Sequence, residues 1–113
     1  MRVLVCGGRD FTDKRGLELS LDQLHADQPI TCLIHGWARG AVTLAGEWAW
    51  KKGIPVRGIQ AEWGKYGKAA GGKRNQKMLD EEKPDLVVAF AGGVGTADMV
   101  QRAELAGVRV VHA

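Results

Sequence analysis

The sequence predicts an α/β fold in which helices cover both faces of one parallel sheet. Short runs rich in β-branched residues alternate with amphipathic segments about five times along the chain, and this alternation is typical of a parallel sheet with helical crossovers. Two of the runs pass directly into glycine-rich loops, GGRD and AGGVGT, which punctuate the change from strand to helix. A chain of 113 residues suits one domain, so we expect residues 1–113 to fold as a single unit.

The first half of the chain is expected to contain three strands and two helices. Residues 2–6 and 31–35 are short apolar runs closed by glycine, which predicts buried strands. Thr12 is the expected cap of the first helix, whose leucines recur at the spacing of one helical face. The second helix is expected over about residues 41–52, and residues 55–60 are expected to form the third strand.

The second half begins with a glycine-rich, basic stretch, residues 61–72, that we expect to be a loop. A polar helix follows over residues 73–82, and the apolar run at residues 85–90 predicts the fourth strand. The last helix is expected over residues 96–106 and the fifth strand over residues 108–112. Strands and helices therefore alternate to the end of the sequence.

Two strand orders fit this alternation, 3-2-1-4-5 and 2-1-3-4-5. We favour the first, a compact sheet in which strands one and four are neighbours where the winding of the chain reverses. Ligands of such sheets bind outside the carboxyl ends of the strands at this switch point. In the favoured order, the loops GGRD and AGGVGT both lie there.

Composition and charge exclude several classes of protein. No apolar run approaches the ~20 residues of a membrane span, and the first apolar run is too short for a signal peptide. Two cysteines, Cys6 and Cys32, make no disulfide framework, so we expect a cytoplasmic protein. The three histidines lack a spacing that suggests metal binding, and no cofactor is predicted. A formal net charge of +3 permits anionic partners.

The stretch AGGVGT predicts an anion-binding loop. Glycine lets backbone N–H groups approach a bound anion, and Thr96 opens a helix whose amino terminus favours negative charge. No Gly-Lys-Ser/Thr follows, so the loop is not a P-loop, and Asp98 holds the place of the third glycine of a dinucleotide fingerprint. A tight turn that needs small residues is the alternative. The candidate ligand-binding residues are Gly92, Gly93, Gly95, Thr96 and Asp98.

Two further loops are expected at the same edge of the sheet. In GGRD, Arg9 can grip a phosphate with two parallel hydrogen bonds, and Asp10 can orient Arg9 or accept a ribose hydroxyl. The alternative is an exposed ion pair worth ~0–1 kcal/mol. In HGWARGA, Trp37 either stacks on a base or covers the end of the sheet. The candidate ligand-binding residues of these loops are Gly7, Gly8, Arg9, Asp10, Gly36, Arg39 and Gly40.

Residues 63–79 combine basic and aromatic side chains with no acidic residue. Long positive side chains beside aromatic rings suit phosphates and bases, whether on a nucleotide or on a single strand. A solvated basic loop is the alternative. We expect this stretch to form a lid over the ligand, with Trp63, Tyr66 and Lys73 as its residues.

Four stretches, GGRDFTD, HGWARGA, AEWGKYGKAAGGKRNQKML and DLVVAFAGGVGTADM, resemble the SLOG superfamily. More narrowly, they resemble its small stand-alone members related to YspA and cpYpsA. The resemblance covers nearly the whole chain and implies a Rossmann-like fold that binds nucleotides or nucleotide-derived ligands. Relatives of this family include the lonely-guy phosphoribohydrolases, the DNA-processing protein DprA, and sensor domains that bind NAD-derived signals.

The resemblance carries over to individual residues only in part. RNQKM matches an Arg-Lys-x-x-Met stretch of the lonely-guy enzymes, which implies that Arg74, with Asn75 beside it, binds ligand. In their Pro-Gly-Gly-x-Gly-Thr-x-x-Glu motif, the proline is replaced by Ala91 and the glutamate by Met99. The aspartate that usually follows ARGA is replaced by Val42. We therefore expect nucleotide binding with little or no hydrolysis, and Met99→Glu as the change that would raise a trace of activity.

The sequence leaves other functions open. A single-stranded nucleic-acid module resembling DprA fits the basic, aromatic stretch, although a net charge of only +3 disfavours it. A phosphoribohydrolase-like enzyme and a purely structural dimer are further alternatives. Trp50 lies about 200° around the second helix from Trp48, on a polar face, so we expect it in a homo-oligomer contact.

Overall fold

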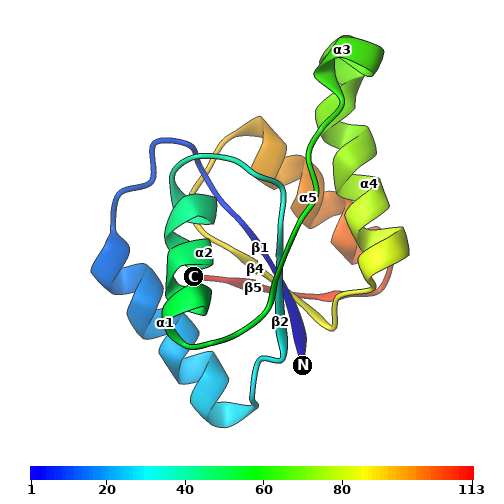
Figure 1. Cartoon of the computed structure of the whole chain (residues 1–113). Helices are drawn as coiled ribbons and strands as arrows, with labels where there is room; N and C mark the ends of the chain where they lie inside the picture. Colours follow the sequence, from blue (N-terminus) through cyan, green and yellow to red (C-terminus); the bar gives the residue numbers. More distant parts are fainter.

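The computed structural model of residues 1–113 contains a five-stranded, all-parallel sheet with helices on both faces (Figure 1). The strand order is β3-β2-β1-β4-β5, which confirms the predicted order 3-2-1-4-5 and excludes the alternative. The strands are β1 (Arg2–Cys6), β2 (Cys32–His35), β3 (Val56–Gly58), β4 (Leu86–Ala89) and β5 (Arg109–His112). Register pairs Leu4 of β1 with Ile34 of β2 and Val87 of β4, so the carboxyl ends of these three strands meet at one edge.

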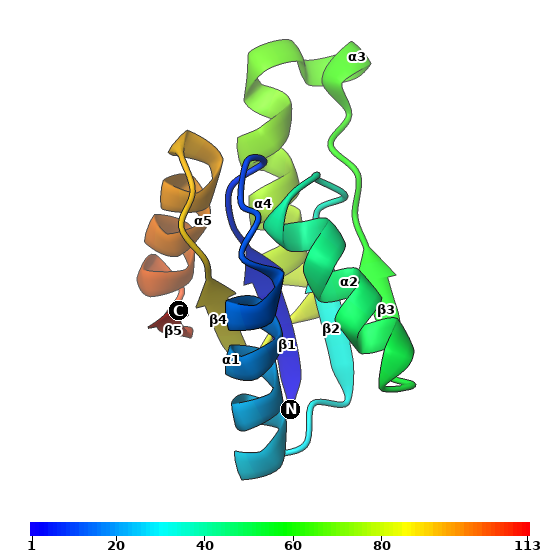
Figure 2. The same ribbon diagram turned by 90° about the vertical axis from the view of Figure 1, so that its left-hand side faces the viewer.

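The helices form two layers, which lie on either side of the sheet in Figure 1, and Figure 2 looks onto the layer of α1 and α2. α1 (Lys14–Asp27) and α2 (Ala41–Lys51) cover one face, and α4 (Ala70–Glu82) and α5 (Val94–Leu105) cover the other. The first helix is capped by Asp13, not by Thr12 as predicted. The Asp13 carboxylate accepts a 3.0 Å hydrogen bond from the Gly16 amide, one residue further along than the sequence pattern suggests. No helix combines the length and the apolar character needed to cross a bilayer.

The stretch predicted as a loop, residues 61–72, is largely helical. α3 (Trp63–Tyr66) and a 3₁₀ turn (Gly67–Ala69) lead directly into α4, and together they project beyond the body of the molecule (Figures 1 and 2). Gly67 has φ of 56°, a conformation that glycine adopts without strain, so the chain changes direction between the two helices. We call residues 63–69 the arm.

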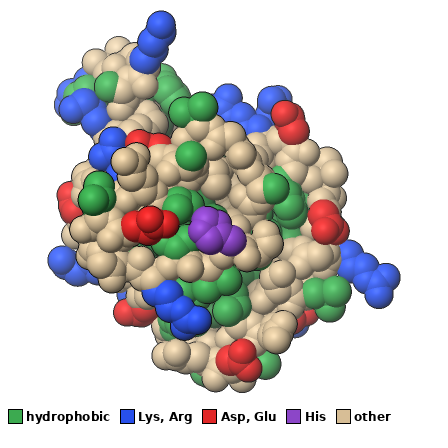
Figure 3. Space-filling model, turned by 180° about the vertical axis from the view of Figure 1, so that it is seen from behind, with side chains coloured by type: hydrophobic (Ala, Val, Ile, Leu, Met, Phe, Trp, Pro, Cys, Tyr) green, Lys and Arg blue, Asp and Glu red, His purple; other side chains and the backbone are tan.

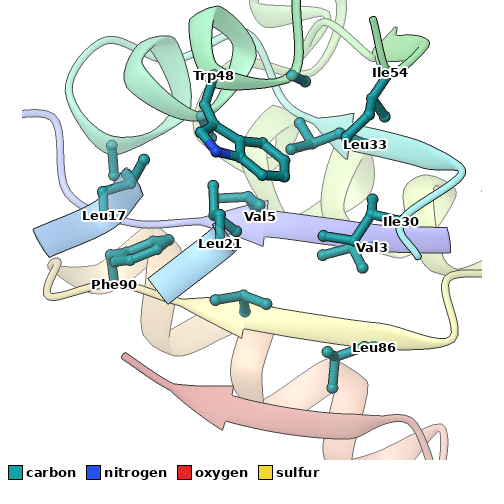
Figure 4. Packing of buried hydrophobic residues seen from close by; sticks show 14 residues of the cluster. Val3, Val5, Leu17, Leu21, Ile30, Leu33, Trp48, Ile54, Leu86 and Phe90 are labelled. Carbon is teal, nitrogen blue, oxygen red and sulfur yellow. The ribbon is translucent and has the colours of Figure 1, made fainter. Parts of the chain in front are cut away.

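The larger core lies between the sheet and the layer of α1 and α2. Alternate residues of a strand face opposite sides of the sheet, so Val3 and Val5 point into this layer. Trp48 of α2 fills its centre, against strand residues and α1 (Figure 4). Its indole nitrogen donates a 2.8 Å hydrogen bond to Asp22, which satisfies the only polar atom of that ring.

The second core lies between the sheet and the layer of α4 and α5. Leu4 and Val87, the neighbours in register, point into it from the sheet. Its helical members are Met78, Leu79, Met99 and Ala103. Both cores pack against the same sheet. This packing fixes where the helices begin, near the carboxyl edge of the sheet.

Glu82 ties α4 to the sheet near the amino-terminal edge. It is 9% exposed and accepts hydrogen bonds of 2.9 and 3.2 Å from Arg57 of β3. Arg2 of β1 adds bonds to its carboxylate and its backbone carbonyl. Hydrogen bonding from Arg57, with the charge of Arg2, lowers the pKa of Glu82. This cluster anchors the end of α4 opposite to the glycine loops.

Candidate functional site

A cavity of about 1300 Å³ opens at the carboxyl ends of β1, β2 and β4. Its walls are the loops that follow these strands, the residues after β3, and the facing side of α4. The volume exceeds the ~300–1000 Å³ common for small-molecule sites. The predicted site residues that line it are Gly7, Gly8, Arg9, Asp10, Gly36, Arg39, Trp63, Arg74, Asn75, Gly92, Gly93, Gly95 and Thr96.

The two glycine loops meet at one side of this cavity. The Gly8 amide donates a 2.9 Å hydrogen bond to the Ala91 carbonyl. A Cβ atom at Gly8 would lie 3.0 Å from the Gly92 Cα, and one at Gly92 would collide with the hydroxyl of Thr96. Only glycine at positions 8 and 92 allows this close approach of two backbones.

α5 begins directly behind these loops. Its cap residue is Gly93, and no side chain caps the helix. The first amides of a helix have no partner within the helix, and the helix dipole favours an anion there. The amino terminus of α5 therefore presents N–H groups where the glycine loops leave the backbone exposed.

Arg74 reaches the cavity from α4 and is held in place by the loop after β2. Its Nη1 donates a 2.6 Å hydrogen bond to the Gly36 carbonyl, and its Nε donates one of 3.1 Å to the Asn75 side chain. A Cβ atom at Gly36 would lie 2.7 Å from the Arg74 guanidinium carbon. Gly36 is thus the residue that lets Arg74 lie flat against this loop.

Behind Arg74, a chain of hydrogen bonds leads away from the cavity. Asn75 is 3% exposed and donates a 2.9 Å hydrogen bond to the carboxylate of Asp98. Arg102 donates a 2.8 Å bond to the same oxygen. Burial opposes ionisation of Asp98, but the bonds from Arg102 and Asn75 lower its pKa overall. Asp98 supports the wall of the cavity and is not one of its lining residues.

The cavity carries positive charge that no acidic side chain neutralises directly. None of the ion pairs in the structure involves Arg9, Arg39 or Arg74. Burial, and then the charge of nearby Arg9, lower the pKa of Arg74. Two carboxylates, Asp10 and Asp13, also line the cavity, and that of Asp13 is engaged as the cap of α1. Arg9 and Arg74 both line the cavity, so their positive charges favour an anion there.

Four predicted site residues lie outside the cavity lining: Gly40, Asp98, Tyr66 and Lys73. Gly40 has φ of 75°, and a Cβ atom there would collide with the carbonyl of Gly8. It shapes the turn that brings α2 against the GGRD loop. On the arm, the Tyr66 ring has the ammonium groups of Lys65 and of Lys73 from α4 at 5.0 and 4.8 Å from its centre, which is a cation–π arrangement.

Other residues contribute to the site that the sequence did not single out. Gln60, expected as the last residue of the third strand, lies with Ala61 after β3, which ends at Gly58, and both residues line the cavity. Val42 lines it as a buried, apolar residue.

Met99, by contrast, is 1% exposed and belongs to the second core. The position that carries a glutamate in the lonely-guy motif therefore faces away from the cavity.

His35 at the end of β2 is a core residue. Its ring is 6% exposed, and its Nδ1 accepts a 3.0 Å hydrogen bond from the Trp37 amide. Burial lowers its pKa, so it is neutral at neutral pH and its proton lies on Nε2. It fixes the loop after β2 rather than facing the cavity.

Comparison with known proteins gives two matches. Residues 1–66 match the model of the family described as "YspA, cpYpsA-related SLOG family". The Gene 61 protein of Mycobacterium phage D29 is 35% identical over an alignment that is 121 residues long with its gaps. The alignment covers 98% of this chain and 94% of the phage protein. The first match contains the loops GGRD and HGWARGA, and the second extends over α4 and α5 as well.

Proposed function

This chain belongs to the YspA, cpYpsA-related SLOG family, and from this premise we propose that it binds a nucleotide or a nucleotide-derived small molecule. The site is the cavity at the carboxyl edge of the sheet. The observation that carries the proposal is the position of Arg74, which lines the same cavity as Arg9 and the uncapped amino terminus of α5 and makes no ion pair.

The chemistry of the cavity suits a phosphate group. Backbone N–H groups of the glycine loop and of the first turn of α5 can surround phosphate oxygens. A guanidinium adds two parallel hydrogen bonds and a charge that is retained at any physiological pH. Arg74 enters with its plane already fixed by Gly36 and Asn75, so little side-chain freedom is lost when a ligand binds.

The same geometry argues for binding without efficient hydrolysis. Cleavage of a base from ribose builds positive charge on the sugar, and enzymes place a carboxylate beside it. Here Met99 is buried in the second core. Of the carboxylates that line the cavity, Asp13 is occupied as a helix cap and Asp10 is exposed on the GGRD loop.

Calorimetric titration with AMP, ADP, ATP, NAD and ADP-ribose tests the proposal. At least one of these compounds should bind, and Arg74→Ala should weaken its binding by about 1.5–3 kcal/mol, the scale of a charged hydrogen bond. Arg109→Ala is the matched control, because Arg109 is exposed on β5 and makes no ion pair. Equal weakening in both variants would mean that net charge, and not this cavity, determines binding.

A second candidate function, the binding of single-stranded nucleic acid, has one observation in its favour. The arm carries two exposed aromatic rings, Trp63 and Tyr66, beside two exposed lysines, Lys65 and Lys68, and basic side chains stand out on it in Figure 3. Stacking rings with backbone-neutralising charges suit a single strand. Binding to oligo(dT) that weakens steeply with salt and is lost in Tyr66→Ala, but not in Arg74→Ala, would favour this function.

We further propose that Trp50 mediates contact between copies of this chain. Its side chain is 81% exposed on α2, where a large aromatic ring gains nothing from the fold of one copy. Sedimentation at increasing concentration should show association that Trp50→Ser reduces. A parent protein that stays monomeric at high concentration would contradict this proposal.

A further inference from the structure

Trp37 combines a strained backbone with an exposed aromatic ring. Its φ is 56°, in the left-handed region that bulky residues rarely adopt. Its side chain is nevertheless 63% exposed and lines the cavity. A side chain that only covered the end of the sheet would be buried against the sheet. An apolar residue without backbone strain would cover the sheet equally well.

The surroundings of Trp37 hold this conformation. The Trp37 amide donates a 3.0 Å hydrogen bond to His35, and the two rings lie edge to face with centroids 5.3 Å apart. The indole lies against Gly58 of β3, where a Cβ atom would collide with the indole nitrogen. One edge of the ring is therefore fixed by β2 and β3, while much of its surface remains accessible from the cavity.

A second tryptophan also lines the cavity. Trp63 follows β3 at the start of the arm and is 52% exposed. A Cβ atom at Gly71 would be 3.4 Å from the outer carbon of its ring, so the indole rests on the first turn of α4. Gln60, which also lines the cavity here, offers an amide that can both donate and accept hydrogen bonds.

The chemistry of the cavity wall therefore differs between its two sides, which follow the strand order. Backbone amides of the glycine loops and α5 lie at the β1 and β4 side, and the two tryptophans follow β2 and β3. Arg74, bonded to the loop after β2, lies on the wall that joins the two parts. A phosphate bound by these backbone amides would direct the rest of a nucleotide toward the two tryptophans.

We propose that Trp37 is the stacking platform for the heterocyclic base of the ligand, with Trp63 as a second aromatic ring that lines the cavity. This inference rests on the proposed function and specifies the ligand as one that carries a planar base as well as a phosphate. Aromatic rings bind bases through their faces with little dependence on sequence or base type. The platform therefore contributes affinity for bases in general, and Gln60 is the residue available to distinguish their edges.

Parallel titrations with a nucleotide and with its base-free fragment test the platform. AMP, GMP, CMP and UMP are compared with ribose 5-phosphate in the parent, Trp37→Ala and Trp37→Phe. We expect the best nucleotide to bind the parent at least about tenfold more tightly than ribose 5-phosphate, as stacking on one ring provides. Trp37→Ala should abolish this difference without changing the affinity for ribose 5-phosphate, and Trp37→Phe should retain most of it.

Trp50→Ala serves as the control for removal of an exposed tryptophan and should leave both affinities unchanged. Circular dichroism establishes that each variant is folded, and Trp37→Phe keeps the test valid if Trp37→Ala unfolds. Equal affinities of the parent for nucleotides and for ribose 5-phosphate would overturn the platform and leave the anion site intact. No binding of any of these probes to the parent would overturn the platform, and it would overturn the proposed function as well if ADP, ATP, NAD and ADP-ribose also fail to bind.

Discussion

The carboxylate of Asp98 accepts a 2.9 Å hydrogen bond from the side-chain amide of Asn75, behind the wall of the cavity. Asn75 in turn accepts a bond from Arg74, whose guanidinium faces the cavity. For the ligand proposed above, Asp98 would therefore act as a positioning residue, through two intervening side chains. Its place next to the glycine loop had predicted direct contact.

Asp98→Ala should weaken nucleotide binding without removing any group from the cavity. The Asn75 amide loses its hydrogen bond to Asp98, so Asn75 is held less firmly where it accepts the bond from Arg74. We expect about a 3- to 10-fold loss of affinity, the scale of one net hydrogen bond, measured by calorimetry. Asp27→Ala is the control, because Asp27 ends α1 in an exposed position and makes no ion pair. Unchanged affinity in Asp98→Ala would show that Arg74 needs no support from this chain.

The glycine loop offers a paired test in adjacent residues. A Cβ atom at Gly92 would lie 2.6 Å from the Gly8 amide nitrogen, whereas one at Gly93 would meet nothing within 4 Å. Gly92→Ala should therefore lower the free energy of unfolding by about 1–3 kcal/mol, as overpacking does, and weaken ligand binding. Gly93→Ala should leave stability nearly unchanged. Thermal unfolding of the two variants measures the difference, and similar melting temperatures would contradict the close contact of the two loops.

The pH dependence of stability should report the ion-pair cluster around Glu82. Its pKa is lowered in the folded protein from an ordinary value of 4.5. The stabilisation is therefore fully present above about pH 4.5 and is lost as the pH falls through the lower, folded value. Glu82→Gln should lower the free energy of unfolding at pH 7 by about 1.5–3 kcal/mol, and this difference should shrink below about pH 4.

Glu81→Gln is the matched control for that measurement. Glu81 is exposed and pairs with Lys77 only at 3.9 Å, an arrangement worth ~0–1 kcal/mol. Urea unfolding of the parent and both variants between pH 3 and pH 7 compares the two positions. A constant difference between the parent and Glu82→Gln across this range would mean that the carboxylate charge contributes nothing.

The strand order could be predicted from the sequence because local and global signals agree. Alternating strands and helices restrict the topology, and each glycine loop follows its strand directly. The contact between Gly8 and Gly92 is a consequence of that topology: once β1 and β4 are neighbours, two loops at their carboxyl ends must meet. This part of the site needed no knowledge of side-chain orientation.

The differences between the predicted and the observed structure arise from contacts between distant parts of the chain. The glycines of residues 61–72 indicated a loop, yet α4 begins at Ala70. A Cβ atom at Gly72 would lie 2.8 Å from the Arg102 guanidinium, so this glycine serves the packing of α4 on α5 rather than a turn. Likewise, the left-handed conformation of Trp37 depends on Gly58 and His35. No local pattern encodes such dependence.

Met99→Glu, which the lonely-guy motif suggested as a route to activity, should instead damage the fold. The Met99 side chain lies in the second core, between the sheet and α4. A carboxyl group there would have no hydrogen-bond partner among its apolar neighbours, and burial of an unpaired polar group lowers the free energy of unfolding by about 2–7 kcal/mol. Met99→Leu, which nearly conserves volume, should change the free energy of unfolding by less than about 1.5 kcal/mol.

Denaturant unfolding measures the stability of both variants, and chromatography after long incubation with nucleoside monophosphates measures the free base that they release. We expect no more base from Met99→Glu than from the parent, because position 99 faces away from the cavity. A stable Met99→Glu variant that releases base would show that α5 turns this position toward the ligand, and it would overturn the placement of Met99 in the core.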